Sequence, residues 1–438
     1  MKEIPVSFSN KPIPSKIKQG GCDEASLLAG LLTLDQARSK MLESITPVSD
    51  IIEVATMDSF GYIIGEDILS PINVPNYKNS AMDGYAVKAC DLPTSDLPTT
   101  ESKPFKLVGT SWAGTPYSGV VNNNECIRIM TGAKVPDDTD TVIMQEHITK
   151  EDDNIVITAG HKAEQNVRCE GEDIKQGDIV LTKGKLINAA EMGLIASLGF
   201  AKVKVLRQLK ISFFSTGDEL RGVGETLEDG QIFDSNRYTI FGMLQKLNVQ
   251  INDMGVIPDD REKIETAFLT AAEQSDVIIT SGGVSVGDAD YVKETLEKLG
   301  QIDFWKLAMK PGKPLAYGKV GNAMFLGLPG NPVSVMATYY QLGLPAIQHL
   351  SGNQNYKPVI AKARAIEHFY KRPGRLDFQR AVFSYDDNGD LVVKGVGMQA
   401  SHILSGMSLA NCFAILPAAS GTISPGETIK IQPFEGLI

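Results

Sequence analysis

The sequence is poor in the residues that build disulfides and soft-metal sites. Its 438 residues include five cysteines and five histidines, which are scattered and contain no Cys-x-x-Cys pair. Dispersed cysteines are typical of a reducing cytoplasm, and their spacing offers no zinc site. A metal in this protein would therefore be held by carboxylates, which are the ligands that magnesium prefers.

Long apolar runs and an excess of positive charge are also absent. No apolar stretch of the sequence approaches the roughly 18 residues of a membrane span. Residues 1–21 contain no continuous apolar segment of the kind found in secretory signals. The formal net charge is −11, which argues against broad binding of nucleic acid or anionic membranes. We therefore expect a cytoplasmic protein with neither as a partner.

Two predicted strands in the second half of the chain each end in a tight turn. They cover residues 276–280 and 323–328, and a helical pattern follows each turn. Ligands of open α/β sheets bind at the carboxyl ends of strands, and helix N-termini there favour anions. We therefore expect a phosphate ligand at these turns. The turn residues are Ser281, Gly282 and Gly283 after the first strand, and Pro329, Gly330, Asn331 and Pro332 after the second.

Residues 304–314 lie between the two turns and alternate like a strand. Their apolar residues would face one side and Lys306 and Lys310 the other, roughly 13 Å apart at ~3.3 Å per residue. Two ammonium groups at this edge suit a substrate with several negative charges. The alternative is a half-exposed strand whose lysines are merely solvated.

Strand and helix patterns alternate from about residue 209 to 348, which predicts a doubly wound, mostly parallel sheet. Four carboxylates directly follow predicted strands and would gather at the edge that holds the glycine turns. Each could be an ordinary helix cap. Together, however, crowded like charges usually need a cation. The four residues are Glu219, Asp259, Asp288 and Asp290.

The first half of the chain is predicted to contain helices followed by strands. Residues 32–45 have the apolar stripe of an amphipathic helix, and residues 51–75 are interpreted as a second helical run. Residues 88–170, and the chain after residue 358, have the short apolar runs and turn signals of β domains.

Four polar residues of the first half are candidates for ligand contacts, each with an ordinary alternative. Asp83 lies in a tight segment and could simply bond its own backbone. Thr131 ends a predicted strand and could bind an oxyanion or merely turn the chain. Arg168 and Asp173 could be ordinary surface charges.

Six separated motifs, in this order, resemble the MoeA family of molybdopterin molybdotransferases, which includes the C-terminal part of gephyrin. The resemblance covers roughly residues 30–438. One motif alone, SGGVSVGD, would indicate only the wider molybdopterin-binding superfamily. The motifs are NSAMDGYAV (79–87), CIRIMTGAKVP (126–136), STGDEL (215–220), SGGVSVGDADYV (281–292), FWKLAMKPGKP (304–314) and GLPGNPVS (327–334).

The resemblance implies a multi-domain α/β plus β fold and an elongated homodimer. In this family the active cleft lies between the α/β domain of one subunit and the β domain of the other. The implied parts are an N-terminal arm (1–24), a helical domain (25–75 and 174–207), an inserted β domain (76–173), a doubly wound molybdopterin-binding α/β domain (208–350) and a C-terminal β-barrel (351–438).

The implied reaction is insertion of molybdate into adenylylated molybdopterin with release of AMP. The two glycine turns and Asp288 would hold the pterin phosphate region, and Lys306 and Lys310 would stabilise anionic oxygens. The magnesium ligands would be Glu219, Asp259 and Asp290, with Asp83, Thr131, Arg168 and Asp173 facing them across the cleft. A molybdopterin adenylyltransferase and molybdoenzyme maturation proteins would be its protein partners.

Two other functions stay open at this point. A nucleotidyl transferase could adenylylate molybdopterin, as single-domain relatives of the α/β unit do, although four domains argue against it. A non-catalytic scaffold could bind molybdopterin or a protein, as gephyrin does at synapses. Crowded carboxylates argue against pure scaffolding, because a scaffold does not need them.

Overall fold

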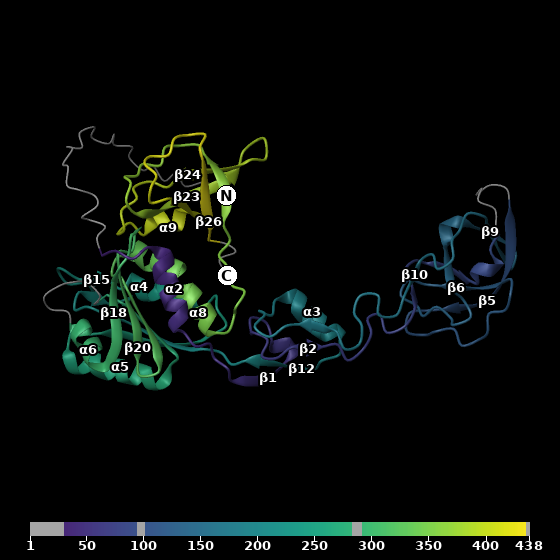
Figure 1. Ribbon diagram of the computed structural model, residues 1–438, viewed down its shortest axis with the longest axis horizontal. Coiled ribbons are helices and arrows are strands. Elements are labelled where there is room, and N and C mark those ends of the chain that lie inside the picture. Colours follow the sequence, from purple (N-terminus) through teal and green to yellow (C-terminus); the bar gives the residue numbers. More distant parts are fainter. Residues whose placement is uncertain (1–29, 94–100, 283–290, 435–438) are drawn as a thin grey trace. The chain divides into compact units, whose positions relative to one another are not determined.

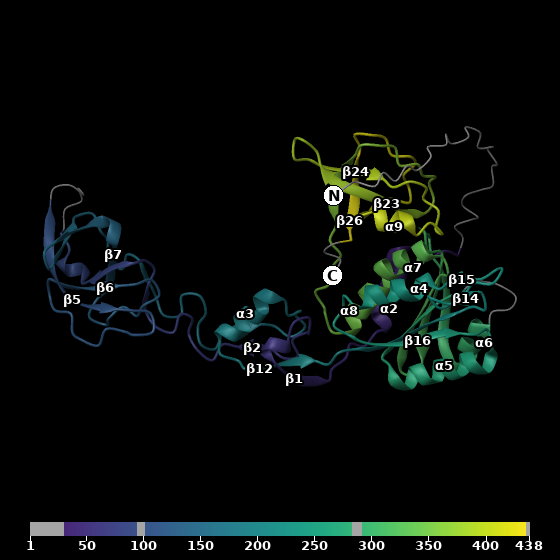
Figure 2. The same cartoon turned by 180° about the vertical axis from the view of Figure 1, so that it is seen from behind.

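The computed structural model describes residues 30–93, 101–282 and 291–434, which form two compact units. The first unit contains Leu209–Ile347 together with the chain up to Ile45 and from Lys357 onward. The second contains Thr46–Gln208 and Gln348–Tyr356. Figures 1 and 2 show the ribbon from opposite sides. Within the described ranges, no helix has the length and apolar character needed to span a membrane.

A six-stranded sheet forms the centre of the first unit, in the order β16-β13-β17-β21-β20-β18. Strands β16, β13, β17 and β21 run parallel, whereas β20 pairs antiparallel with both of its neighbours, β21 and β18. The predicted doubly wound, mostly parallel sheet is therefore confirmed. The strands are β13 (Lys210–Thr216), β16 (Gln250–Ile257), β17 (Val277–Ser281), β18 (Gly300–Lys306), β20 (Pro314–Val320) and β21 (Ala323–Leu328), with a small β14 (Leu220–Arg221) and β15 (Ile232–Phe233) pair beside them.

Helices cover both faces of this sheet, α5 and α6 on one side and α2, α4 and α8 on the other (Figures 1 and 2). Phe268 of α5 packs between Phe214 and Phe325 of the sheet, with ring centroids 5.1 and 5.6 Å away. Burial of these large apolar side chains fixes the helix layer on the sheet. The helices are α4 (Ser235–Leu244), α5 (Arg261–Gln274), α6 (Tyr291–Leu299), α7 (Pro332–Thr338) and α8 (Leu344–Leu350), with a π-helical turn at Tyr339–Gly343.

The predicted helix at residues 32–45 is confirmed as α2 (Leu34–Ser44), which begins at a Thr33 cap. Its contacts correct the predicted grouping of residues 25–75 into one helical domain. Arg38 Nη2 donates to the Gln341 carbonyl at 3.0 Å, and the Tyr317 hydroxyl donates to the Met41 carbonyl at 3.2 Å. The apolar stripe of α2 is therefore buried against the α/β part.

The C-terminal part of the first unit is a closed β-barrel, as predicted. Its strands pair in the order β23-β24-β22-β26-β25, and a further β23–β25 pairing closes the ring. These strands are β22 (Ala361–Ala365), β23 (Leu376–Tyr385), β24 (Leu391–Gly395), β25 (Cys412–Leu416) and β26 (Thr428–Pro433), with a short helix α9 (Ser405–Leu409).

The single strand predicted over residues 304–314 is wrong. Strand β18 ends at Lys306, and the next pair of residues, β19 (Met309–Lys310), joins the barrel sheet in parallel with β23. The chain turns back over residues 307–313, where the Leu307 amide donates to the Lys313 carbonyl at 2.7 Å. Pro311 and Pro314 have no amide hydrogen, so this segment could not continue as a regular ladder.

In the second unit, the β region predicted for residues 88–170 is confirmed as a six-stranded sheet in the order β7-β4-β6-β5-β9-β8. Successive residues of its central strands point to opposite faces, and each face carries a core cluster, one with Tyr85 and Val87 and the other with Ala86 and Val142. The strands are β4 (Gly84–Val87), β5 (Ser102–Ser111), β6 (Glu125–Ile129), β7 (Thr141–Met144), β8 (Ile148–Glu151) and β9 (Asn154–Thr158), with a flanking pair β3 (Asn79–Ser80) and β10 (Val167–Arg168).

The helical run predicted for residues 51–75 is wrong. Strand β1 (Ile51–Ala55) pairs with β12 (Lys202–Leu206), and β2 (Ile68–Leu69) pairs with β11 (Ile179–Leu181). The β-branched residues of β1 favour a strand once a distant partner is present. Helix α3 (Ala189–Ser197) begins at Asn188, and Glu191 Oε2 accepts the Asn188 amide at 3.0 Å.

Candidate functional site

The two glycine turns line a single pocket of about 390 Å³ at the carboxyl ends of β17 and β21. We call it the turn pocket. Ser281 and Gly282 come from the first turn, and Gly330, Asn331 and Pro332 from the second. The structure thus brings these predicted residues together, while the predicted Gly283 and Asp288 lie outside the described residues.

Asn236, at the start of α4, joins the two turns. Its Nδ2 atom donates to Ser281 Oγ at 2.8 Å and to the Gly330 carbonyl at 2.7 Å. The Asn236 Oδ1 and Asp234 Oδ2 atoms are buried without a partner, so a ligand that donates hydrogen bonds could satisfy them. Sequence reasoning missed Asn236, whose one signal is its place two residues after Asp234, the N-cap of α4.

Gly282 is required by the backbone of the first turn. Its φ angle is +92°, a conformation that L side chains rarely adopt. A Cβ atom at this position would lie 2.9 Å from the carbonyl oxygen of Thr216, which is too close for a real contact. The first turn therefore needs a residue without a Cβ, and the Gly282 amide donates to the Leu328 carbonyl at 3.3 Å.

Of the four carboxylates predicted at this edge, Glu219 and Asp259 are described, and Asp288 and Asp290 lie outside the described residues. Glu219 lines the pocket, and the Asp259 amide donates to Asp218 Oδ1 at 3.1 Å. Burial raises the pKa of Asp259, and the charges of Asp218 and Glu219 raise it further. The third predicted metal ligand, Asp290, lies outside the described residues. Among the residues that are described, no group of three His, Cys, Asp or Glu side chains could hold a metal ion.

A second pocket, of about 680 Å³, lies between the α/β part and the barrel of the first unit. We call it the lysine pocket, because Lys310 and Lys313 line it together with Arg375. Ser401 and His402 line its barrel side. Sequence reasoning missed Arg375, Ser401 and His402, although residues 372–380 are the most charged stretch of the barrel.

The two pockets share three lining residues, Gly330, Asn331 and His402. They therefore adjoin, so that a group held in one pocket can reach a group held in the other. Lys306, in contrast, is exposed at the end of β18, and it lines neither pocket. Its neighbour in register, Pro314, does line the lysine pocket.

In the second unit the structure brings Asp83 and Thr131 together. Asp83 Oδ1 accepts the Thr131 amide at 2.7 Å and the Thr131 hydroxyl at 2.8 Å. These two bonds lower the pKa of Asp83, and the charge of Arg128 adds to the effect. Arg168 is exposed on β10, in register with Asn79 at the start of the Asp83 segment, and Asp173 is also exposed.

Comparison with known families matches nearly the whole described chain. Residues 32–199 match the MoeA N-terminal region (domain I and II), residues 212–349 a probable molybdopterin binding domain, and residues 362–434 the MoeA C-terminal region (domain IV).

Named relatives cover most of this chain as well. A molybdopterin molybdenumtransferase of Haemophilus influenzae is 47% identical over 410 residues, which are 93% of this chain and 100% of that protein. Gephyrin of Dictyostelium discoideum is 32% identical over 94% of this chain and 63% of its own length. Among solved structures, the molybdopterin biosynthesis moeA protein from Pyrococcus horikoshii OT3 has a TM-score of 0.79 at 26% identity, covering 92% of this chain and 100% of that one.

Proposed function

This chain belongs to the MoeA family and acts in molybdenum cofactor biosynthesis, and we propose that it is a molybdopterin molybdenumtransferase. The proposed reaction inserts molybdate into adenylylated molybdopterin and releases AMP. One observation carries the proposal: a pocket made by two anion-binding turns adjoins a pocket made by three cationic side chains.

The turn pocket suits the phosphate region of adenylylated molybdopterin. The Ser281 hydroxyl and the main-chain amides of Gly330 and Asn331, which line the pocket, would donate to phosphate oxygens. The predicted Gly283 and Asp288 would extend the same loop. In this arrangement the phosphate link between molybdopterin and AMP lies beside Glu219.

The lysine pocket suits molybdate, a compact dianion. Lys310, Lys313 and Arg375 would neutralise its charge, and Ser401 would donate a hydroxyl hydrogen bond. Charge-assisted donors fixed in place before binding also stabilise oxygen charge that develops during metal transfer. Lys306 would act from the rim of this pocket.

Magnesium belongs to the proposal through Glu219, Asp259 and Asp290. Burial raises the pKa of Asp259, the charges of Asp218 and Glu219 add to the rise, and a bound cation would offset both effects. Magnesium, when bound, would neutralise charge on the adenylyl phosphate. Glu219 and Asp259 would orient the phosphate link and keep it at the mouth of the lysine pocket.

The remaining parts of the proposal concern assembly and surroundings. We propose a cytoplasmic homodimer in which Asp83, Thr131, Arg168 and Asp173 complete the active cleft. The Asp83–Thr131 bonds support a fixed acidic group in the β domain. A molybdopterin adenylyltransferase would supply the substrate, and molybdoenzyme maturation proteins would receive the product.

The decisive experiment incubates the purified protein with adenylyl-molybdopterin, molybdate and magnesium, and measures AMP. We expect AMP release that depends on molybdate and stops when EDTA removes magnesium. Consumption of ATP with free molybdopterin would favour the adenylyltransferase alternative instead. Binding of adenylyl-molybdopterin without any AMP release would favour the scaffold.

A further inference from the structure

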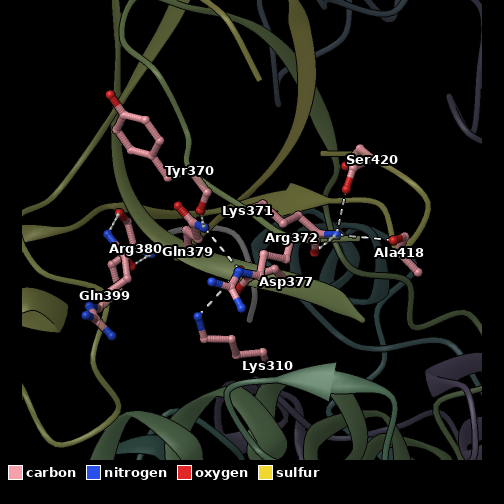
Figure 3. Close-up of polar contacts among 10 residues, drawn as sticks. All are labelled: Lys310, Tyr370, Lys371, Arg372, Asp377, Gln379, Arg380, Gln399, Ala418 and Ser420. Atoms are coloured by element: carbon pink, nitrogen blue, oxygen red, sulfur yellow. Dashed lines mark hydrogen bonds and ion pairs between the residues drawn. The ribbon is translucent and has the colours of Figure 1, made fainter. Parts of the chain in front are cut away.

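The barrel places a buried carboxylate directly beside Lys310. Asp377 is the second residue of β23, and it is in register with Lys310 of β19. Its side chain is only 7% exposed, whereas that of Lys310 is 49% exposed and lines the lysine pocket. The Lys310 ammonium lies 3.9 Å from Asp377 Oδ2 (Figure 3).

Asp377 itself is held in place by the barrel. Gln379 Nε2 donates to Asp377 Oδ2 at 3.1 Å and to the Tyr370 carbonyl at 3.0 Å, so the carboxylate is fixed to the main chain through one side chain. Gln379 is 4% exposed. A carboxylate fixed in this way can hold a flexible partner, because it loses little entropy when the partner binds.

Two other cations near Asp377 donate to main-chain carbonyls, although the buried Nε atom of Arg380 has no hydrogen-bond partner. The Lys371 ammonium donates to three main-chain carbonyls, those of Arg372, Ala418 and Ser420, at 3.0, 3.2 and 2.9 Å (Figure 3). Arg380 is buried, and its Nη2 donates to the Met398 carbonyl at 2.6 Å. Lys310, by contrast, forms an ion pair with Asp377 and also lines a pocket.

The positive charge of the lysine pocket explains how the Asp377 carboxylate can act on Lys310. Lys310, Lys313 and Arg375 all line one pocket, and their like charges repel one another when no anion is bound. A long lysine side chain would then turn toward solvent, because its ammonium is strongly hydrated and its stem is flexible. An adjacent buried carboxylate keeps the ammonium at the pocket wall.

We propose that Asp377 is a positioning residue, which holds Lys310 toward the lysine pocket so that the pocket is ready for an oxyanion. The inference rests on the proposed function, since it assumes that molybdate binds there. Under this proposal the barrel contributes to the site, because Asp377 of strand β23 orients the side chain of Lys310.

The first test measures steady-state kinetics of Asp377→Asn with molybdate and adenylyl-molybdopterin varied separately. We expect the KM for molybdate to rise about tenfold, the scale on which loss of a supporting partner weakens a polar site. The KM for adenylyl-molybdopterin should stay unchanged. Asp386→Asn is the matched control, because it breaks an ion pair with Arg364 in the same barrel, away from both pockets, and it should leave both KM values unchanged.

A double-mutant cycle separates positioning from a merely structural role. If Asp377 acts through Lys310, Lys310→Met and the Lys310→Met/Asp377→Asn double variant should have the same KM for molybdate. A further rise in the double variant would overturn the proposal, because Asp377 would then act through another group. If thermal melting shows that Asp377→Asn does not fold, Asp377→Glu is the second variant, because it keeps the negative charge but moves it. A wild-type KM for molybdate in Asp377→Glu would also overturn the proposal.

The outcomes also separate this inference from the proposed function. A wild-type protein that releases no AMP with molybdate present contradicts the proposed function itself. An active wild type whose Asp377→Asn variant keeps a normal KM for molybdate contradicts only the positioning role.

Discussion

At the scale of single residues, the proposed phosphate site can be tested at Gly282 in the first turn. We predict that Gly282→Ala weakens binding of adenylyl-molybdopterin, because the added methyl group meets the Thr216 carbonyl and the positive φ angle becomes strained. The strain alone is expected to cost about 1 kcal/mol of unfolding free energy. Calorimetric titration with adenylyl-molybdopterin, together with thermal melting, measures the two effects.

Gly193→Ala is the control for this substitution. Gly193 lies in α3, where no atom would approach an added Cβ within 4 Å, so the change should be neutral or stabilise the helix by roughly 0.5–1 kcal/mol. Equal affinity of wild type and Gly282→Ala for adenylyl-molybdopterin would contradict the phosphate-binding role of the first turn.

The Asp83–Thr131 pair predicts a dependence of stability on pH. A lowered pKa in the folded state means that the bonds stabilise the fold above the ordinary value of 3.8 and are lost as pH falls through the folded value. Thr131→Val removes the hydroxyl bond but keeps the amide. Its loss of stability should therefore be present at neutral pH and should shrink in acid, as measured by melting temperature against pH.

Thr139→Val supplies the comparison for this prediction. The Thr139 hydroxyl donates to the Pro136 carbonyl at 3.0 Å, an acceptor that does not titrate. Its loss of stability should stay constant with pH. A parallel pH dependence for both variants would mean that Asp83 does not bond the Thr131 hydroxyl in solution.

At the scale of elements, the junction between β16 and α5 carries two adjacent aspartates with different tasks. Asp260 caps α5, because its side chain accepts the Lys263 amide at 3.0 Å. Asp259 lies among carboxylates at the sheet edge, where its raised pKa shows that the folded state disfavours its charge. We predict that Asp259→Asn abolishes AMP release without loss of stability, whereas Asp260→Ala costs about 1 kcal/mol and leaves turnover unchanged.

The two aspartate variants serve as controls for each other, since they differ by one position on the same junction. The measurements are AMP release against magnesium concentration and unfolding by urea. Excess magnesium should partly restore turnover of Asp259→Asn, because its ligand set is weakened and not removed. A wild-type rate and magnesium response in that variant would show that Asp259 is structural.

At the scale of the whole molecule, the predicted homodimer can be tested by complementation. Asp83→Asn and Lys306→Ala each remove one predicted contribution to the cleft. If a cleft combines the β domain of one subunit with the α/β domain of the other, mixed dimers contain one cleft without either substitution. We therefore predict that AMP release is partly recovered when the two inactive variants are mixed.

The complementation requires proof that the subunits exchange. Two affinity tags, one on each variant, allow isolation of mixed dimers, and size-exclusion chromatography with light scattering gives their mass. A mixture of each variant with itself is the control. Mixed dimers with no more activity than this control would contradict a shared cleft.

The elements of this protein follow from local sequence patterns. The apolar run before Ser281, the strand at residues 323–328 and the Asn331–Pro332 helix start all form as expected, because turn chemistry and burial of apolar runs act over a few residues. Alternation of strand and helix was enough to predict the doubly wound sheet, whereas the regular short strands predicted only a C-terminal β domain, and the barrel was implied by the family resemblance.

Only the tertiary structure decided where segments distant in sequence meet. Residues 51–55 became a strand because β12 pairs with them, a contact that overrides weak local preference. Lys310 lies in β19 of the barrel sheet and not in the predicted strand, and it is therefore in register with Asp377. Tertiary packing also places three further residues in the pockets, namely Asn236, Arg375 and His402. Each lies far along the chain from the glycine turns, and no sequence spacing links them. The periodicity of apolar residues indicates which side of a local element is buried. A binding site, in contrast, depends on how elements that are distant in sequence pack together.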